Sequence, residues 1–431
     1  MKKKMTRREF LRLVAGATTL AGAGLLTRLF RRSSGVINVT GATDPYKGYL
    51  PIIMKADPTA TPTATSTPTP SKTPTPSKTP TVTQTVSPPT SSRVVHVWNT
   101  NATDWNFSSS WYGDYVSQST VNTMTSQGLL TLTGKSTIVQ AWQSILPNYS
   151  SGKGIAIKVN FNNQWGDCTD QSNRIDALVE PVNALISGML SMGVQPQDIW
   201  IFDAMRPVPD RFRTRLVNQS VRVFDSKGCG GNEMSFDSTN PSATISFNRA
   251  GVTSRKLADV LVNCTYLINM PILKDHGISP VTLGMKNHYG SIDYVIGTDG
   301  DGLHRMIDVD DSLYSSSYSP IVVINQNANI RNKTVLVVGD GLYGALGNTA
   351  ATPTRWSSFS NDSPNSLFFS RDPVAIECVM FDVLNADSAS HPKRGANEDD
   401  YLKIAHNAGM GTYERGDPWT DTYTQIDYIR I

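Results

Sequence analysis

The segment PILKDHGISPVTLGMKNHYG, residues 271–290, places two lysines, two histidines and an aspartate directly behind an apolar run. Lysine ammonium groups bind carboxylates and phosphates through charge-assisted hydrogen bonds. His276 can exchange a proton near neutral pH, which makes it a candidate catalytic acid or base. The segment therefore has the residue types needed to bind a small anion and to transfer a proton.

The spacing within this segment predicts how these groups are arranged. Lys274 and His276 are two residues apart, so an extended chain places them on the same side. Ser279 and Pro280 have the pattern of a helix N-cap followed by proline at the first helical position, and Gly290 suits the helix end. The predicted helix carries three candidate ligand-binding side chains: Thr282, Lys286 and Asn287.

The same segment contains residue types that bind metals, but the spacing does not favour a metal site. Asp275, His276 and His288 are suitable ligands, yet the two histidines are twelve residues apart and no H-x-H or H-x-x-x-H occurs. The two nearby lysines would also repel a cation. We therefore predict an anion site and no metal site.

Cysteine spacing also limits the choice of cofactor. The four cysteines form no C-x-x-C pair, which excludes a ferredoxin-type cluster and a compact zinc knuckle. One disulfide is possible outside the cytoplasm, and the pairing of Cys168, Cys229, Cys264 and Cys378 stays open, although Cys264 and Cys378 lie in apolar surroundings typical of buried thiols. G-x-S-x-G, P-loop and strand-linked G-x-G-x-x-G motifs do not occur either, so no motif supports a hydrolase triad or a nucleotide-binding fold. The cofactor stays unknown.

The elements around the segment must position these groups. Apolar runs predict strands within residues 152–162, 198–204, 221–226 and 333–341, and the apolar region 257–273 ends in another strand. Residues 174–193 have helical spacing, and 366–384 has the pattern of a strand, an Asp-Pro turn and a helix. Continuous apolar strands separated by helices predict an α/β fold with a mostly parallel sheet covered by helices on both faces.

In parallel sheets, ligands bind beyond the carboxyl ends of the strands. Polar side chains follow several predicted strands, and a parallel sheet would bring them to one edge. The candidate ligand-binding residues at these ends are Lys158, Asn160, Lys274 and Asp372. Asp203 and Asp340 are candidate catalytic residues, and one or the other would orient His276. Taken singly, Asp340 and Asp372 also suit turns, because glycine and proline follow them, and Asp372 could cap a helix.

The chain resembles a bacterial and archaeal family known as "domain of unknown function 362". The resemblance lies in IKVNFN, LINMPILKDHGISPVTLGMKNHYGSID, VLVVGDGLYGALGN and FFSRDPVAIECVM, in that order, and covers roughly residues 150–385. Asp275 and Glu377 differ from the threonine and aspartate that relatives often have there. Some relatives add cysteine-rich ferredoxin segments, which this chain lacks. The resemblance implies a shared fold and a shared polar centre, and points to the exported branch of the family, whose body would start near Arg93.

The N-terminal residues 1–34 have the form of a twin-arginine export signal. Arg7 and Arg8 occupy the paired positions, Phe10 and Leu11 follow, and a short apolar stretch comes next. About fourteen apolar residues are too few to span a bilayer permanently. We therefore expect an exported protein in the periplasm or at the cell surface, and leave open whether the signal is cleaved or kept as an anchor.

Three further parts follow the signal. Residues 35–56 form a short patch, and residues 57–92 are rich in proline and threonine, which predicts a disordered stalk because there is almost nothing apolar to bury. In extended geometry such a stalk would reach up to about 100 Å. Residues 93–431 are expected to form one α/β domain, with envelope association through the signal or the stalk.

The charge distribution argues against a nucleic-acid partner. The whole chain has a formal charge of +3, but residues 1–34 alone hold +8, which leaves 3 − 8 = −5 on the remainder. Positive charge is thus concentrated in the signal and not on a folded basic face. The expected partner is a small anionic ligand, and the sequence does not indicate the oligomeric state.

Two functions fit these observations. The first is an exported enzyme or binding site for a small carboxylate or phosphate, with the reaction and substrate undetermined. The alternative is a cell-surface binding module without chemistry, displayed on the stalk. Trp98, Trp105, Trp111 and Trp142 would favour this alternative if they were exposed, since exposed tryptophans can grip a glycan.

Overall fold

The computed structural model describes residues 92–108, 110–169, 172–250, 252–293, 302–347, 351–387 and 397–431. These residues belong to one compact unit. The predicted export signal, the patch and all but the last residue of the predicted stalk lie outside the described residues. Within the described part of the chain, no helix combines the length and apolar character needed to cross a membrane.

One large sheet contains most of the strands. Its order is β13-β1-β12-β11-β8-β2-β3-β4-β5, and β9 pairs with both β11 and β10. The strands of this sheet are β1 Val94–Trp98, β2 Ile155–Lys158, β3 Ile199–Asp203, β4 Arg222–Asp225, β5 Asn232–Glu233, β8 Tyr266–Asn269, β9 Ile272–Asp275, β10 Val281–Thr282, β11 Thr334–Ala345, β12 Ser366–Ser370 and β13 Tyr428–Arg430. A separate antiparallel pair is formed by β6 Thr244–Ile245 and β7 Arg255–Lys256.

The sheet is mostly parallel, as the sequence predicts. The strands β11, β8, β2, β3, β4 and β5 run parallel to one another. β12 is antiparallel to both β11 and β1. In the described part of the connection from β11 to β12, residues 346–347 and 351–365, only the 3-10 turn Ser357–Phe359 is helical, and β12 returns beside β11, as antiparallel neighbours can.

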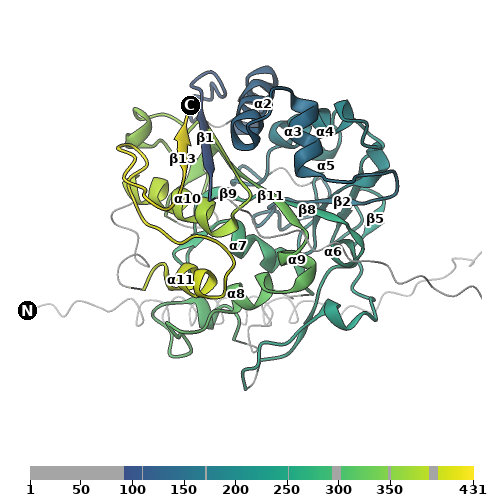
Figure 1. Cartoon of the computed structure of the whole chain (residues 1–431), viewed down its shortest axis with the longest axis vertical. Helices are drawn as coiled ribbons and strands as arrows, with labels where there is room; N and C mark the ends of the chain where they lie inside the picture. Colours follow the sequence, from purple (N-terminus) through teal and green to yellow (C-terminus); the bar gives the residue numbers. More distant parts are fainter. Residues whose placement is uncertain are drawn as a thin grey trace, which may run out of the picture. The chain divides into compact units, whose positions relative to one another are not determined.

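Helices cover both faces of the sheet (Figure 1). One face carries α2 Gln118–Thr133, α3 Ile138–Ile145 and α4 Val179–Ser191, and the other carries α6 Asp259–Asn263, α7 Gly284–Asn287, α8 Pro320–Asn325, α9 Ala328–Arg331, α10 Pro373–Asp387 and α11 Asp400–Asn407. The short helix α5 Asp210–Arg213 follows β3. Side chains along β2 alternate between two hydrophobic cores: Ile155 and Ile157 join one, and Ala156 joins the other. The α/β fold with helices on both faces is thus confirmed.

The helix predicted to start at Ser279 begins later. Val281–Thr282 instead pairs with Lys274–Asp275 as the antiparallel strand β10. The Ser279 hydroxyl donates a hydrogen bond to the carbonyl of Val281, and the backbone is helical only over α7, which continues into the 3-10 turn His288–Ser291. Strand pairing thus overrides the Ser-Pro capping pattern here.

Candidate functional site

A cavity of about 230 Å³ lies at the carboxyl ends of β2 and β3, next to the segment that follows β9. We call it the cleft. It is lined by Lys158, Asn160, Asn162, Trp165, Asp203, Met205, Arg206, His276, Gly277, Ile278, Thr282, Lys286, Asn287, Tyr289, Gly290 and His304. Seven of the ten residues predicted from the sequence are among these lining residues. The position agrees with the rule that ligands bind at the carboxyl edge of parallel strands.

The ammonium group of Lys158 is the centre of a buried polar network. Its Nζ donates to three oxygens: the carbonyl of Val159 at 2.5 Å, Asp203 Oδ2 at 3.2 Å and Asn287 Oδ1 at 3.1 Å. Burial lowers the pKa of Lys158, and the Asp203 carboxylate opposes that shift. Three acceptors account for three ammonium hydrogens, so Lys158 is charged and paired within the protein.

A second lysine lies behind the cleft wall. Lys274 does not line the cavity, but its Nζ donates to Asn160 Oδ1 at 3.2 Å, and the Asn160 amide donates to Asn287 Oδ1 at 3.1 Å. Burial lowers the pKa of Lys274, while the carboxylates of Asp176 and Asp203 raise it. Lys274 therefore contributes positive charge to the cleft through Asn160 and does not itself reach the cavity.

Asp176 is a buried carboxyl group that the sequence did not reveal. Its Oδ1 accepts from the backbone N–H of Asn163 at 2.8 Å, and Oδ2 has no hydrogen-bond partner in the described part of the chain. Burial raises the pKa of Asp176, and the Lys274 charge lowers it. Asp176 lies within residues 174–193, whose spacing predicts a helix, but α4 begins only at Val179 and Asp176 belongs to the loop before it. No polar strand end or motif in the sequence marked this residue as part of a site.

His276 and Lys286 are in direct contact in the lining of the cleft. Lys286 Nζ lies 2.9 Å from His276 Nε2 and 5.1 Å from the centre of the Tyr289 ring. The other ring nitrogen, Nδ1, accepts hydrogen bonds from the backbone N–H groups of Ile278 and Ser279 at 3.0 and 3.1 Å. Burial, helped by the charge of Lys274, lowers the pKa of Lys286 to about 7.

The helix that carries Lys286 is held from three sides. The Met285 N–H in its first turn donates to Glu377 Oε2 at 2.5 Å, and Glu377 Oε1 accepts from the Tyr401 hydroxyl at 2.8 Å. The side-chain amides of Asn269 and Asn325 donate to the carbonyls of Gly284 and Met285, each at 2.7 Å. These buried contacts fix α7 and so fix where Lys286 enters the cleft.

Arg206 brings a buried, partly unsatisfied guanidinium group to the cleft. Its Nε donates to the carbonyl of Asn162 at 3.2 Å, and the guanidinium carbon lies 3.6 Å from the centre of the Trp165 ring. Arg206 is only 8% exposed, and its Nη2 is buried without a hydrogen-bond partner among the described residues. The hydroxyl of Thr282, also in the cleft lining, is likewise without a partner there. The sequence places Arg206 with Asp203 among the polar groups at the end of the same predicted strand, but Arg206 was given no role among the candidate site residues.

Asp340, predicted as a catalytic partner of His276, does not lie in the cleft. The Asp-Gly pair was expected to end the strand, but β11 continues to Ala345 because its second half pairs with β9 and β12. Asp340 Oδ1 accepts from the N–H of Leu342 at 3.1 Å, and burial raises the pKa of Asp340 to about 7. Since backbone N–H groups occupy Nδ1 of His276, Asp203 does not orient that ring through Nδ1 either.

Asp372 was expected at the shared strand edge, and this placement is wrong. Because β12 is antiparallel to β11, its carboxyl end lies beside Val337 near the amino end of β11. Asp372 Oδ1 accepts from the N–H groups of Val374 and Ala375, each at 2.9 Å, and thereby caps α10. The capping alternative describes this residue.

Two of the residues weighed as metal ligands have hydrogen-bond partners of another kind. Asp275 Oδ2 accepts from the N–H of Gly347 at 2.8 Å, while Nδ1 of the buried His288 lies 3.0 Å from the Ser291 hydroxyl. Over the ranges that the structure describes, no three His, Cys, Asp or Glu side chains are grouped to hold a metal ion.

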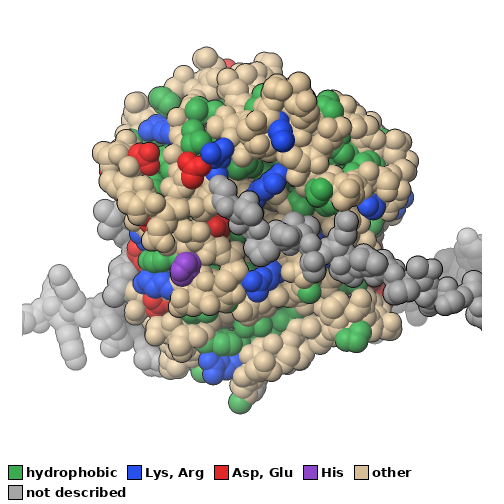
Figure 2. All heavy atoms as spheres, in the orientation of Figure 1, with side chains coloured by type: hydrophobic (Ala, Val, Ile, Leu, Met, Phe, Trp, Pro, Cys, Tyr) green, Lys and Arg blue, Asp and Glu red, His purple; other side chains and the backbone are tan. Residues whose placement is uncertain are grey.

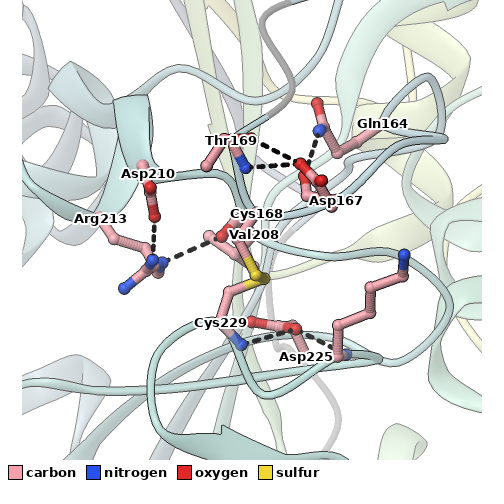
Figure 3. Close-up of a disulfide and its surroundings, with 10 residues drawn as sticks. Gln164, Asp167, Cys168, Thr169, Val208, Asp210, Arg213, Asp225 and Cys229 are labelled. Carbon is pink, nitrogen blue, oxygen red and sulfur yellow. Dashed lines mark hydrogen bonds and ion pairs between the residues drawn. A yellow bond between two sulfur atoms is a disulfide. The ribbon is translucent and has the colours of Figure 1, made fainter. Parts of the chain in front are cut away.

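A disulfide fastens the loop that forms one wall of the cleft. Cys168, in the loop that carries Asn162 and Trp165, is bonded to Cys229 in the β4–β5 connection, as Figure 3 shows. Asp225 Oδ1 accepts from the N–H of Cys229 at 3.2 Å and holds that side of the bridge. Cys264 and Cys378 are buried free thiols, as predicted.

Comparison with known proteins gives a family but no activity. No curated protein matches this chain. The family model described as "Domain of unknown function (DUF362)" matches residues 155–382, which run from β2 into α10 and include every lining residue of the cleft. The resemblance seen in the sequence is thereby confirmed, and the chain belongs to the DUF362 family.

Proposed function

We propose that the cleft binds a small anion, a carboxylate or a phosphate. The observation that carries this proposal is the Arg206 guanidinium, which is buried, stacked on Trp165 and left with an unpartnered Nη2 in the described part of the chain. A buried donor without an acceptor is costly, and a guanidinium forms paired hydrogen bonds to carboxylate or phosphate oxygens. The Thr282 hydroxyl is a second unpartnered group in the same cavity.

The charges around the cleft support an anion over a cation. Lys158 forms an ion pair with Asp203 at 3.2 Å, so these two charges balance. Lys274 is opposed by Asp176, which leaves the charge of Arg206 in excess among these five described groups. At about 230 Å³ the cavity is smaller than the roughly 300–1,000 Å³ typical for drug-sized ligands. A compact anion fits both the charge and the size.

Calorimetric titration of the full chain with acetate, lactate and phosphate tests this proposal. We expect saturable binding of at least one of these ions. The Arg206→Met variant should bind it about 10- to 150-fold more weakly, since a hydrogen bond to a charged group contributes about 1.5–3 kcal/mol. Lys135→Met is the matched control, because it removes the charge of an exposed lysine that does not line the cleft. Equal affinity of the Arg206 and Lys135 variants, or no binding of any of the three ions, would refute the proposal.

The tryptophans give little support to the alternative of a glycan-binding module. Trp105 and Trp142 are buried in the core, and Arg211 and Arg215 lie over the ring of the half-buried Trp111. Trp98 is the exposed one of the four. On the face shown in Figure 2, hydrophobic side chains form small separate groups. We therefore favour the small-anion site.

An exported location forms part of the same proposal. The Cys168–Cys229 disulfide supports it, because disulfides persist in oxidising compartments and are rare in the cytosol. The expected result is that Arg7→Lys/Arg8→Lys, which removes the paired arginines, retains the protein in the cytoplasm on cell fractionation. Export unchanged in that variant would contradict the twin-arginine route.

A further inference from the structure

The hydrogen bonds of His276 determine where its proton lies. Nδ1 accepts from two backbone N–H groups, those of Ile278 and Ser279. A nitrogen that accepts two hydrogen bonds carries no hydrogen, and a neutral imidazole then carries its single hydrogen on the other nitrogen. The Nε2–H of His276 therefore points at Lys286 Nζ, 2.9 Å away.

This arrangement determines the protonation state of Lys286. Because Nε2 is a donor, Nζ must accept, and only a neutral amine has the lone pair to do so. Lys158 shows the opposite pattern, since its Nζ faces three oxygen acceptors. Among the described residues, Lys286 Nζ forms its hydrogen bond with His276 and not with an oxygen acceptor. The shift of the Lys286 pKa to about 7, caused by burial, agrees with this geometry.

We propose that Lys286 is a nucleophilic lysine that forms a Schiff base with the carbonyl group of a small 2-oxo acid. This inference rests on the proposed function, because Arg206 and the Thr282 hydroxyl would bind the carboxylate of the same molecule. A neutral amine in a desolvated site is the reactive form for this chemistry. The substrate class is thus an anion with a carbonyl group next to its carboxylate.

The covalent step balances without a further reactant. The Nζ lone pair attacks the carbonyl carbon, and one amine proton moves to the carbonyl oxygen to give a carbinolamine. The C–O bond then breaks, the second amine proton leaves with the hydroxyl group, and one water is released as the imine forms. When the substrate enters, the Nε2–H of His276 stops donating to Nζ and donates a hydrogen bond to the former carbonyl oxygen instead. This hydrogen bond stabilises the negative charge that develops on that oxygen during the attack.

Reductive trapping of the full chain tests the proposal. The protein is incubated with pyruvate and sodium cyanoborohydride near neutral pH, and the modified lysine is located by peptide mass spectrometry. The reduced adduct adds the mass of pyruvic acid less one oxygen atom. We expect labelling of Lys286 to exceed that of exposed Lys135 at least about tenfold, because an ordinary lysine has about a thousandfold less free amine at this pH. The rate at Lys286 should level off above pH 7, where its amine is fully deprotonated.

The controls separate this inference from the anion site. Lys158 and Lys274 are buried internal controls in the same sample and should stay unlabelled, and lactate, which lacks the carbonyl, should give no adduct. Labelling spread over exposed lysines with none on Lys286 would overturn the inference. If lactate and pyruvate bind in an Arg206-dependent way but no adduct forms, the Schiff base is refuted and the anion site stands. Failure of all anions to bind would overturn both.

Discussion

Removing the Cys168–Cys229 disulfide should destabilise the domain by an amount set by chain entropy. The bridge joins residues 61 apart in the sequence and so closes a ring that contains α4, β3 and β4. For a ring of this size the lost loop entropy is about 14 cal/mol/K, which corresponds to about 4 kcal/mol at room temperature. We therefore expect the double variant Cys168→Ser/Cys229→Ser to lose about 4 kcal/mol of unfolding free energy.

Urea unfolding followed by tryptophan fluorescence measures this loss. The oxidised protein, the protein reduced with dithiothreitol and the double variant are compared in the same buffer. The reduced protein should match the double variant, and dithiothreitol should not change the double variant further, because Cys264 and Cys378 are already free thiols. A loss below about 1 kcal/mol would refute the argument that this bridge acts by restricting the unfolded chain.

Three further predictions concern the cleft and the pH dependence of stability. In Gly290→Ala the new Cβ would lie 2.7 Å from Lys158 Nζ, so we expect a loss of about 1–3 kcal/mol in urea unfolding, whereas Gly277→Ala, where the Cβ meets nothing within 4 Å, should be neutral. Lys158→Met leaves the Asp203 carboxylate buried and unpaired and should cost about 3–5 kcal/mol; adding Asp203→Asn should recover part of this, and no recovery would contradict the pairing. The pKa of His96 is lowered to about 3 by burial, so the unfolded chain binds the proton first and stability falls as pH drops from 6.5 toward 3. In His96→Gln that slope should be about 1.4 kcal/mol per pH unit shallower, and identical slopes would exclude this cause.

The fold could be predicted from the sequence because buried parallel strands are continuously apolar. The runs around Ile155–Lys158 and Ile199–Asp203 carry this pattern on both faces, so both strands were identified. The direction of β12 could not be inferred from its own residues, because a strand has the same pattern in either direction. The sequence of the connection does indicate the direction of β12, because residues 346–365 lack the helical spacing that a crossover between parallel strands needs.

The sequence predicted those site residues that directly follow a buried strand. Lys158, Asp203 and His276 follow buried strands directly, and the sheet brings them to one cavity. Asp340 was misplaced because Asp-Gly is a strong turn signal, which pairing on both sides of β11 overrides. Neither the tautomer of His276 nor the state of Lys286 could be read from the sequence, because both depend on how the turn after β9 directs two backbone N–H groups.

The direction of the first strand determines how the domain can be attached to a surface. β1 runs the same way as β11 and β2, since it is antiparallel to β12, so the chain enters it from Arg93 at the amino edge of the sheet. Ile431 lies at the other end of β1, where its carbonyl accepts from the N–H of Trp98 at 2.8 Å. The cleft opens at the carboxyl edge. Immobilisation through residues before Arg93 therefore leaves the entrance of the cleft accessible, whereas a C-terminal affinity tag starts from the edge at which ligands enter.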